Sequence, residues 1–293
     1  MRVVLASLLV SALAFAQGGN PADTGGTRPT EEKKPEEHLR TYEMPGITVV
    51  GERATLLREE DRIGTYGQPR WSADRRFTET RVYVIPEGKF ELEWWTRIEV
   101  PKDGPTELTF IQEAEIGLPY RFQLDLYTVE KKAGNQGSLD WDEVKIETRW
   151  ALADWDEIPM NPTLYLEYVG PNKESTRVEA KLLLGTELAE RWHYGANIVW
   201  DHATGDDRDT SWEVNQGISY TLADEKVSLG VETNFEIHDD KDHRWEALEQ
   251  DYLIGPSVQV RPLPQMHIDF SPLFGINDEA PDAKITLIFG WEF

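Results

Sequence analysis

The sequence contains no cysteine, which excludes disulfides and thiolate metal sites. Beyond its first sixteen residues it also has no apolar run long enough to form a membrane-spanning helix. Basic residues are scarce, because 30 Lys and Arg stand against 54 Asp and Glu and the formal net charge is −24. This surplus of acid argues against nucleic acid as a partner, since phosphate recognition needs a basic surface.

Aromatic residues, in contrast, are abundant: the chain has 11 Trp, 10 Tyr and 10 Phe. Its negative mean hydropathy of −0.54 and its 29% of charged residues are values typical of a water-soluble protein. A transmembrane β-barrel has similar averages, because only every second residue of each strand faces lipid. The composition is therefore compatible with a barrel, and the aromatic residues suit the girdles that such barrels carry at the membrane interfaces.

The chain begins with the features of a secretory signal. Arg2 precedes an apolar run from Val3 to Phe15, and Ala14 and Ala16 are small residues at the positions that a signal peptidase reads. We therefore expect a cleaved signal peptide over residues 1–16.

Three further segments follow from the change in composition. Residues 17–45 are rich in Gly, Pro, Thr, Glu and Lys, and we expect a disordered tether there. We expect residues 46–88 to form a periplasmic N-terminal segment or a small plug. Residues 89–293 are expected to form the membrane-embedded part, and nearly all of the excess negative charge lies in them.

The last strand shows the clearest alternation, with apolar or aromatic residues at every second position from Ile285 to Phe293. Earlier runs of similar length lie at about 89–100, 107–118, 121–130, 143–153, 163–169, 176–187, 192–201, 211–222, 226–237, 252–262 and 265–276. With the last strand they predict an all-β fold, namely a transmembrane antiparallel up-and-down β-barrel of about twelve strands.

The connections between these runs alternate in length, as they do in a barrel with short turns at one end and longer loops at the other. One connection, Asp154 to Pro162, is long for its end. Pro256 and Pro272 fall inside predicted strands, where we expect bulges to accommodate them. The alternative fold is a periplasmic β-sandwich or small barrel with one wet face. It accounts for the alternating residues but not for the alternating connections.

The C-terminal strand resembles the recognition signal of bacterial outer-membrane β-barrel proteins, and the layout as a whole resembles porin-like channels for small solutes. The first resemblance implies a membrane-insertion signal at Phe289, Trp291 and Phe293. Together they imply a protein of the bacterial outer membrane. Its implied partners are outer-membrane lipid, lipopolysaccharide and the barrel assembly machinery.

The segment Gly46–Arg53 resembles the TonB box of TonB-dependent receptors. This resemblance implies a docking strand for a periplasmic protein at Ile47, Thr48, Val49 and Val50, captured by strand addition. The chain departs from those receptors because it has room for neither their large globular plug nor their larger barrel. This departure puts energised uptake in doubt.

Charged residues at the inward positions of the predicted strands should line the lumen. They are Glu91, Glu93, Arg97, Glu113, Glu115, Asp125, Lys145, Glu147, Arg149, Glu179, Lys181, Glu232, Glu236 and Arg261. Either acids pair with bases and close the lumen, or the surplus of acid lines a narrow water-filled pore that favours cations. Four arginines precede the barrel, and one hypothesis is that they enter the lumen as a plug and pair with its glutamates: Arg70, Arg75, Arg76 and Arg81.

The sequence thus predicts an outer-membrane channel for passive or gated passage of small solutes, narrow and cation-preferring. The alternative is a non-conducting structural or interaction barrel that acts through its acidic outer loops or its periplasmic tail. No enzyme activity and no cofactor are expected, because His193 and Asn197 share an inward face without a nucleophile beside them. No metal site is expected either, since His238–His243 lies in a predicted loop without a fixed scaffold.

Overall fold

The computed structural model describes residues 58–293 except 135–136, 172–174, 205–208, 225 and 240–248. The predicted signal peptide, the tether, the docking strand Ile47–Val50 and the rest of the chain before residue 58 therefore lie outside the described residues. Among the described residues, no helix is long and apolar enough to cross a membrane.

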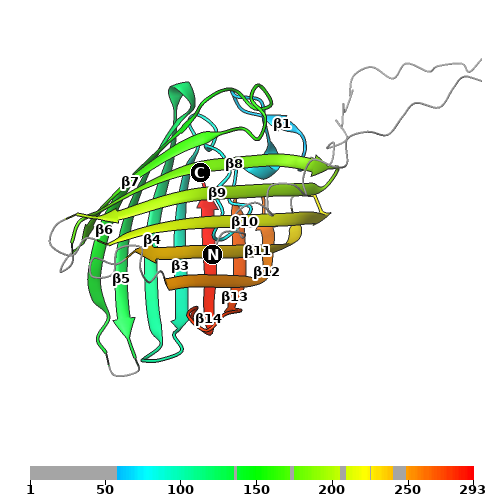
Figure 1. Cartoon of the computed structure of the whole chain (residues 1–293). Coiled ribbons are helices and arrows are strands. Elements are labelled where there is room, and N and C mark those ends of the chain that lie inside the picture. Colours follow the sequence, from blue (N-terminus) through cyan, green and yellow to red (C-terminus); the bar gives the residue numbers. More distant parts are fainter. Residues whose placement is uncertain (1–57, 135–136, 172–174, 205–208, 225, 240–248) are drawn as a thin grey trace, which may run out of the picture. The chain divides into compact units, whose positions relative to one another are not determined.

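Twelve strands form one closed antiparallel barrel (Figure 1). They are β3 (Phe90–Val100), β4 (Glu107–Leu118), β5 (Phe122–Ala133), β6 (Asp140–Ala151), β7 (Thr163–Pro171), β8 (Arg177–Ala189), β9 (Trp192–Ala203), β10 (Thr210–Ala223), β11 (Val227–Asp239), β12 (Glu249–Leu263), β13 (Met266–Gly275) and β14 (Ala283–Glu292). Each strand pairs with the next, and β14 pairs with β3 to close the ring. The predicted up-and-down barrel is confirmed, and the sandwich alternative is wrong.

The two faces of the barrel wall are inverted relative to a soluble protein. Large apolar side chains are exposed on the outside, and Leu166 in β7, for example, is 52% exposed. Carboxylates lie on the inside, where Glu113 is 2% exposed. The period-2 alternation of each strand sends its polar residues inward and its apolar residues outward, as expected for a wall surrounded by lipid.

The connections fall into two groups. Those at 119–121, 190–191, 224–226 and 264–265 are short and lie at the end of the barrel that we call the short-turn end. The opposite, long-loop end carries the connections at 101–106, 134–139, 172–176, 204–209, 240–248 and 276–282. This asymmetry agrees with the prediction. The connection at 152–162 is the exception at the short-turn end.

The two prolines inside strands are not accommodated by bulges, so that expectation is wrong. Strand β12 pairs with β13 at Ile254↔Phe274 and again at Val258↔Phe270, in the same register on both sides. The ladder between these two pairs is interrupted where Pro256 lies, because proline has no N–H to donate. The one register shift of this strand pair lies between Val260 and Leu263.

The chain ahead of the barrel begins with β1 (Arg62–Ile63), β2 (Gln68–Pro69) and the short 3-10 helix η1 (Arg70–Ser72). Residues 73–88 then run through the ring of strands, where their side chains and backbone contact inward residues of β3, β4, β5, β9, β11, β12 and β14. We call residues 58–88 the lumen segment. The barrel interior is filled by this segment and by the wall side chains that meet it.

A charge placed on the outer face should test whether that face meets lipid. We expect Leu166→Arg to lower the free energy of unfolding by about 2–4 kcal/mol in a bilayer, because a charge inside the hydrocarbon layer is poorly solvated. Leu263→Arg, next to the turn 264–265, should cost only about 0–1 kcal/mol. Urea titration of both variants in lipid vesicles measures this difference. Equal, small effects would contradict a lipid-facing wall.

Candidate functional site

A continuous row of acids winds through the lumen, and each acid lies directly opposite the next in the strand register. The row, which we call the acid ladder, consists of Glu91, Glu115, Asp125, Glu147, Glu167, Glu179 and Asp201. It crosses seven consecutive strands, from β3 to β9. Glu91 lies near the short-turn end and Asp201 near the long-loop end, so the row extends along the length of the barrel.

Like charges directly opposite each other on neighbouring strands repel, so the ladder needs cations between its members. The wall supplies them from β5 to β9. Arg149 lies 2.9 Å from Asp125 and 2.5 Å from Glu147, and Lys145 lies 3.2 Å from Glu167. Lys181 contacts Glu179, and Arg177 contacts Asp201.

On β3 and β4, near the short-turn end, Glu91 pairs with His267 of the wall, and the lumen segment adds two arginines. The Arg75 guanidinium donates from Nε (2.8 Å) and Nη2 (2.6 Å) to the two oxygens of Glu93, and from Nη2 to Glu113 (3.3 Å). Its Cζ also lies 4.1 Å from the centre of the Trp95 ring. This combination of a bidentate ion pair and a cation–π contact holds Arg75 firmly to β3 and β4.

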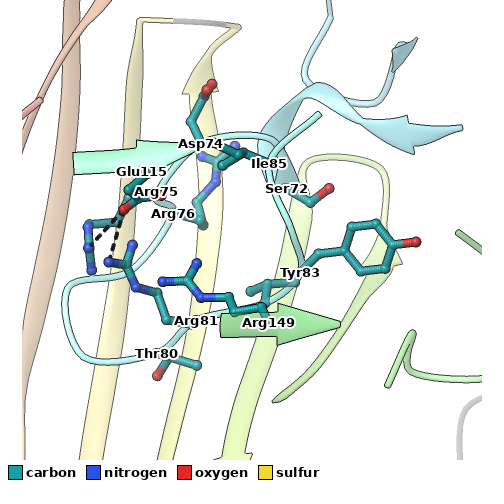
Figure 2. A pocket seen from close by; sticks show the side chains of 11 residues that line it. Ser72, Asp74, Arg75, Arg76, Thr80, Arg81, Tyr83, Ile85, Glu115 and Arg149 are labelled. Carbon is teal, nitrogen blue, oxygen red and sulfur yellow. Dashed lines mark hydrogen bonds and ion pairs between the residues drawn. The ribbon is translucent and has the colours of Figure 1, made fainter. Parts of the chain in front are cut away.

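Arg81 approaches the same acids from the other side. Its Nη2 donates to Glu113 (2.9 Å) and to Glu115 (3.1 Å). Figure 2 shows Arg75 and Arg81 converging on Glu115, beside a cavity that Arg149 also lines. The cavity volume is about 20 Å³, which is room for about one water molecule. The lumen segment therefore leaves little free space where it crosses this cluster.

Acids of the lumen segment contact bases of the wall in the reverse sense. Asp74 pairs with Arg261 and Lys89, while Glu79 lies 3.2 Å from Lys284 and 3.5 Å from Arg97. Burial raises the pKa of Glu79, but the two cations and the Thr286 hydroxyl lower it further, to about 2. Glu79 is therefore ionised at neutral pH. The segment and the wall are held by reciprocal charges.

The backbone of the lumen segment is also satisfied by wall side chains, as buried peptide groups require. Glu232 accepts the N–H groups of Thr78 (2.9 Å) and Glu79 (2.8 Å). Asn197 accepts the N–H of Arg81 (2.8 Å) and donates to its carbonyl (2.6 Å). The Gln123 side chain accepts the N–H of Ile85, and Gln259 donates to the carbonyl of Arg75.

An aromatic cluster fixes the segment at the short-turn end. Trp155, in the connection 152–162, packs edge-on against Trp71 (5.5 Å between ring centres) and against Tyr83 (5.2 Å). The backbone N–H of Trp155 donates to the carbonyl of Tyr66, and the Tyr83 hydroxyl donates to the carbonyl of Ala153. The unusual length of this connection is thus explained, because it covers the root of the lumen segment.

The structure places the predicted lumen residues as follows. The acids Glu93, Glu113, Glu115, Asp125, Glu147 and Glu232 and the base Arg149 are buried in the lumen, and Glu91 is paired there with His267 at 2.5 Å. Glu236 lies 3.3 Å from His238, and Arg97, Lys145, Glu179, Lys181 and Arg261 make the ion pairs given above. Of the four arginines ahead of the barrel, Arg75 and Arg81 contact wall glutamates. Arg76 pairs with Glu59 of its own segment, at 2.5 Å.

The predicted insertion signal lies at the seam where the barrel closes. Phe289 contacts Trp94 and Phe293 contacts Phe90, with ring centres 5.7 and 5.5 Å apart, and Trp291 is part of the same strand, β14. The predicted inward pair His193 and Asn197 serves the lumen segment instead: His193 packs on Trp71 at 4.6 Å, and Asn197 binds the backbone of Arg81.

Several residues that matter here were missed at the sequence level. Trp95 and Tyr127 stand at inward positions of their strands, so the alternation could have identified them. The amides of Gln123 and Gln259 also have inward parity, but their role depends on a backbone that crosses the lumen, which no local pattern reveals. The acid ladder depends on strand register, which alternation alone leaves open.

These features define a closed, twelve-stranded antiparallel β-barrel of the transmembrane type, with its lumen occupied by residues of its own chain ahead of the barrel. The crystal structure of an outer-membrane channel from Pseudomonas putida F1 is similar to it, with a TM-score of 0.55 at 10% identity over 72% of this chain and 98% of that chain. NanC porin gives a TM-score of 0.49 at 10% identity over 69% and 98%, and KdgM porin gives 0.46 at 8% over 69% and 99%.

The sequence comparisons are more limited. The family described as putative MetA-pathway of phenol degradation matches residues 169–289, which run from the end of β7 to β14. A search of curated proteins finds no significant match. At these low identities, the likeness to solved structures establishes the fold alone.

Inward glycines leave space that the lumen segment fills. Replacing such a glycine with a larger residue should therefore displace the segment. A Cβ on Gly217 of β10 would lie 2.5 Å from the Phe77 ring. We expect Gly217→Val to destabilise the seated segment by about 1–3 kcal/mol, measured as faster proteolysis of residues 58–88 in a folded barrel. Adding Phe77→Ala should restore protection in part, and the outward neighbour change Ile218→Val should have no effect. Unchanged proteolysis in Gly217→Val would contradict this seating.

The pKa of Glu79 predicts a pH-dependent contribution to stability. Because its folded-state pKa of about 2 lies below the ordinary value of 4.5, Glu79 stabilises the protein above about pH 4.5, and this contribution is lost as the pH falls toward 2. Glu79→Gln should therefore lower Tm at pH 6, and its difference from the wild type should shrink between pH 4.5 and 2. Thermal unfolding of both proteins across this range measures the effect. A difference independent of pH would show that the charge of Glu79 is not what matters.

Proposed function

We propose that this protein is an outer-membrane channel for small solutes whose lumen is closed at rest by residues 58–88. The observation that carries the proposal is the reciprocal anchoring of this segment inside a polar lumen. Its Arg75 and Arg81 pair with wall acids, while its Asp74 and Glu79 pair with wall bases. Passage then requires the segment to move, so the channel is gated.

The outer membrane is the proposed location because the wall is apolar outside and polar inside, in the fold of an outer-membrane channel. The short-turn end would face the periplasm, as in barrels of this kind. The matched family is named for a pathway of phenol degradation, which supports small organic molecules as the class of solute. No catalytic step is part of the proposal.

A cation preference follows from the charges of the wall. When the lumen segment leaves, Arg75 and Arg81 leave with it, and Glu93, Glu113 and Glu115 lose those cations. These three carboxylates would then add unpaired negative charge to the lumen, and their field would attract cations and repel anions.

The proposed partners act at the surfaces of the barrel. Outer-membrane lipid and lipopolysaccharide would surround it, and the barrel assembly machinery would insert it through the strand ending in Phe289, Trp291 and Phe293. A periplasmic protein that binds Ile47–Val50 would be attached close in sequence to the lumen segment, and could therefore influence its position.

A second reading is a non-conducting barrel that acts through its loops or its periplasmic tail. The small cavity and the many anchors of the lumen segment favour it, because they close the lumen tightly. Conductance separates the two readings.

The decisive experiment compares single-channel currents of the refolded wild type and of Arg75→Ala/Arg81→Ala in planar bilayers. We expect rare, small openings in the wild type. In the variant we expect frequent, larger openings with a cation-selective reversal potential, because two anchors are lost. Arg121→Ala, which removes a pair with Asp154 in the turns, serves as the matched control and should behave as the wild type does. Silence of both folded barrels would favour the non-conducting reading.

A further inference from the structure

Four wall residues form a box around the two guanidinium groups of the lumen segment. Its floor is the Trp95 ring, with the Cζ atoms of Arg75 and Arg81 at 4.1 and 5.6 Å from the ring centre. Glu93 accepts a hydrogen bond from Arg75 (2.6 Å), and Glu113 accepts from both Arg75 (3.3 Å) and Arg81 (2.9 Å). Glu115 accepts from Arg81 (3.1 Å). We call Glu93, Trp95, Glu113 and Glu115 the arginine box.

The Trp95 side chain is itself held in place. Its indole N–H donates to Glu93 Oε2 (2.9 Å), and the ring belongs to a buried apolar group with Ile111, Tyr127, Val129 and Ile288. The box is therefore a preorganised part of the wall, with the ring and the carboxylate fixed relative to each other.

The charge of the wall around the box is negative without the lumen segment. Two nearby wall cations are engaged with other wall acids: Arg149 with Asp125 and Glu147, and His267 with Glu91 and Asp269. A third, Arg97, has its Cζ 5.9 Å from the centre of the Trp95 ring and pairs with Glu79 of the lumen segment. His267 Nε2 also lies 3.5 Å from Glu93. Three buried carboxylates next to one another cannot all stay ionised at low cost, so a vacated box would take up either protons or a cation.

We propose that the arginine box is a binding site for small solutes that carry a guanidinium group, and that Arg75 and Arg81 occupy it when no solute is present. The geometry selects guanidinium over ammonium. Arg75 uses two nitrogens of one planar fork on the two oxygens of Glu93 while its face lies over Trp95, and a compact ammonium cannot do both. The lumen's own lysines bind elsewhere, as Lys181 does over Tyr165 at 4.4 Å.

Competition with a tethered group sets the concentration range. A group held on a short flexible linker acts at an effective concentration on the order of millimolar. A free monovalent guanidinium solute must therefore reach at least millimolar concentrations to displace Arg75 in the wild type. With Arg75 removed, the same solute should bind at lower concentrations. The role of this binding in opening the channel rests on the proposed function. The binding itself does not require conduction.

The test uses the full chain refolded in detergent, with methylguanidinium chloride as the probe and methylammonium chloride at equal concentration as its match. In Arg75→Ala we expect methylguanidinium to raise Tm in a saturable manner, and methylammonium to act only as salt. Replacing Trp95 as well (Arg75→Ala/Trp95→Leu) should weaken the apparent affinity roughly 3- to 30-fold, the range a cation–π contact supplies. Arg121→Ala, outside the lumen, should show no such rescue.

Two further measurements keep the proposal open to refutation if Arg75→Ala does not refold. Arg81→Ala removes the guanidinium that contacts Glu113 and Glu115. In this variant, methylguanidinium should again raise Tm more than methylammonium does. In the wild type, tens of millimolar methylguanidinium should speed proteolysis of residues 58–88 more than methylammonium does. Equal effects of the two salts in these proteins would overturn the inference.

The outcomes for the site and for the channel are separable. Selective rescue by methylguanidinium in a barrel that never conducts would keep the arginine box and remove the channel. Cation-selective currents without any preference for methylguanidinium would keep the channel and remove the box.

Discussion

The structure depends on one constraint: carboxylates enclosed in a barrel must find positive charge, because they are buried away from solvent. The wall meets this need along part of the acid ladder with Arg149, Lys145, Lys181 and Arg177. On β3 and β4 the lumen segment adds positive charge, because Arg75 pairs with Glu93 and Arg81 pairs with Glu113 and Glu115. Folding of the barrel and seating of the segment are therefore electrostatically coupled.

Buried ion pairs of this kind hold a segment in a defined position without necessarily holding it strongly. The Coulombic attraction between Arg75 and Glu93 is large, but both groups give up hydration, so the net gain is small compared with the cost of removing one partner alone. A segment held in this way can be exchanged for another cation that satisfies the same carboxylates. Removal of the segment without a replacement cation is unfavourable, because the buried carboxylates are then left unpaired. This asymmetry is suited to a gate that opens for a ligand of matching charge.

The architecture could be predicted from the sequence because alternation is a local property. The alternation in runs such as 107–118 and 192–201 indicates which residues face outward. The alternating lengths of the connections indicate that consecutive strands are antiparallel neighbours. Prediction was less successful where a longer-range relation decides. Pro256 was expected in a bulge, but its strand keeps its register and loses part of the ladder instead. The role of Trp155 was not predicted, and only the unusual length of its connection was noted, because its partners Trp71 and Tyr83 are remote in sequence.

The same distinction applies to the site. The alternation along each strand identified Glu93, Glu113 and Glu115 as inward residues, and the arginines ahead of the barrel suggested a plug. The pairing of Glu91 with Glu115, and of Glu115 with Asp125, needs the register of two strand pairs, and only that register turns separate acids into a ladder.

The aromatic contacts of the lumen segment and the ion pairs of Arg75, Glu79 and Arg81 lie at different levels of the barrel. At the short-turn end, Trp71 and Tyr83 pack on Trp155 in a contact that is apolar and insensitive to ions. Deeper in the lumen, Arg75, Glu79 and Arg81 are held by charges that a competing ion can replace. A cation that enters from the long-loop end would meet the charged anchors without touching the aromatic ones. The residues between Phe77 and Arg81 are therefore the part of the segment whose displacement would open the lumen first, while the root stays in place to return it.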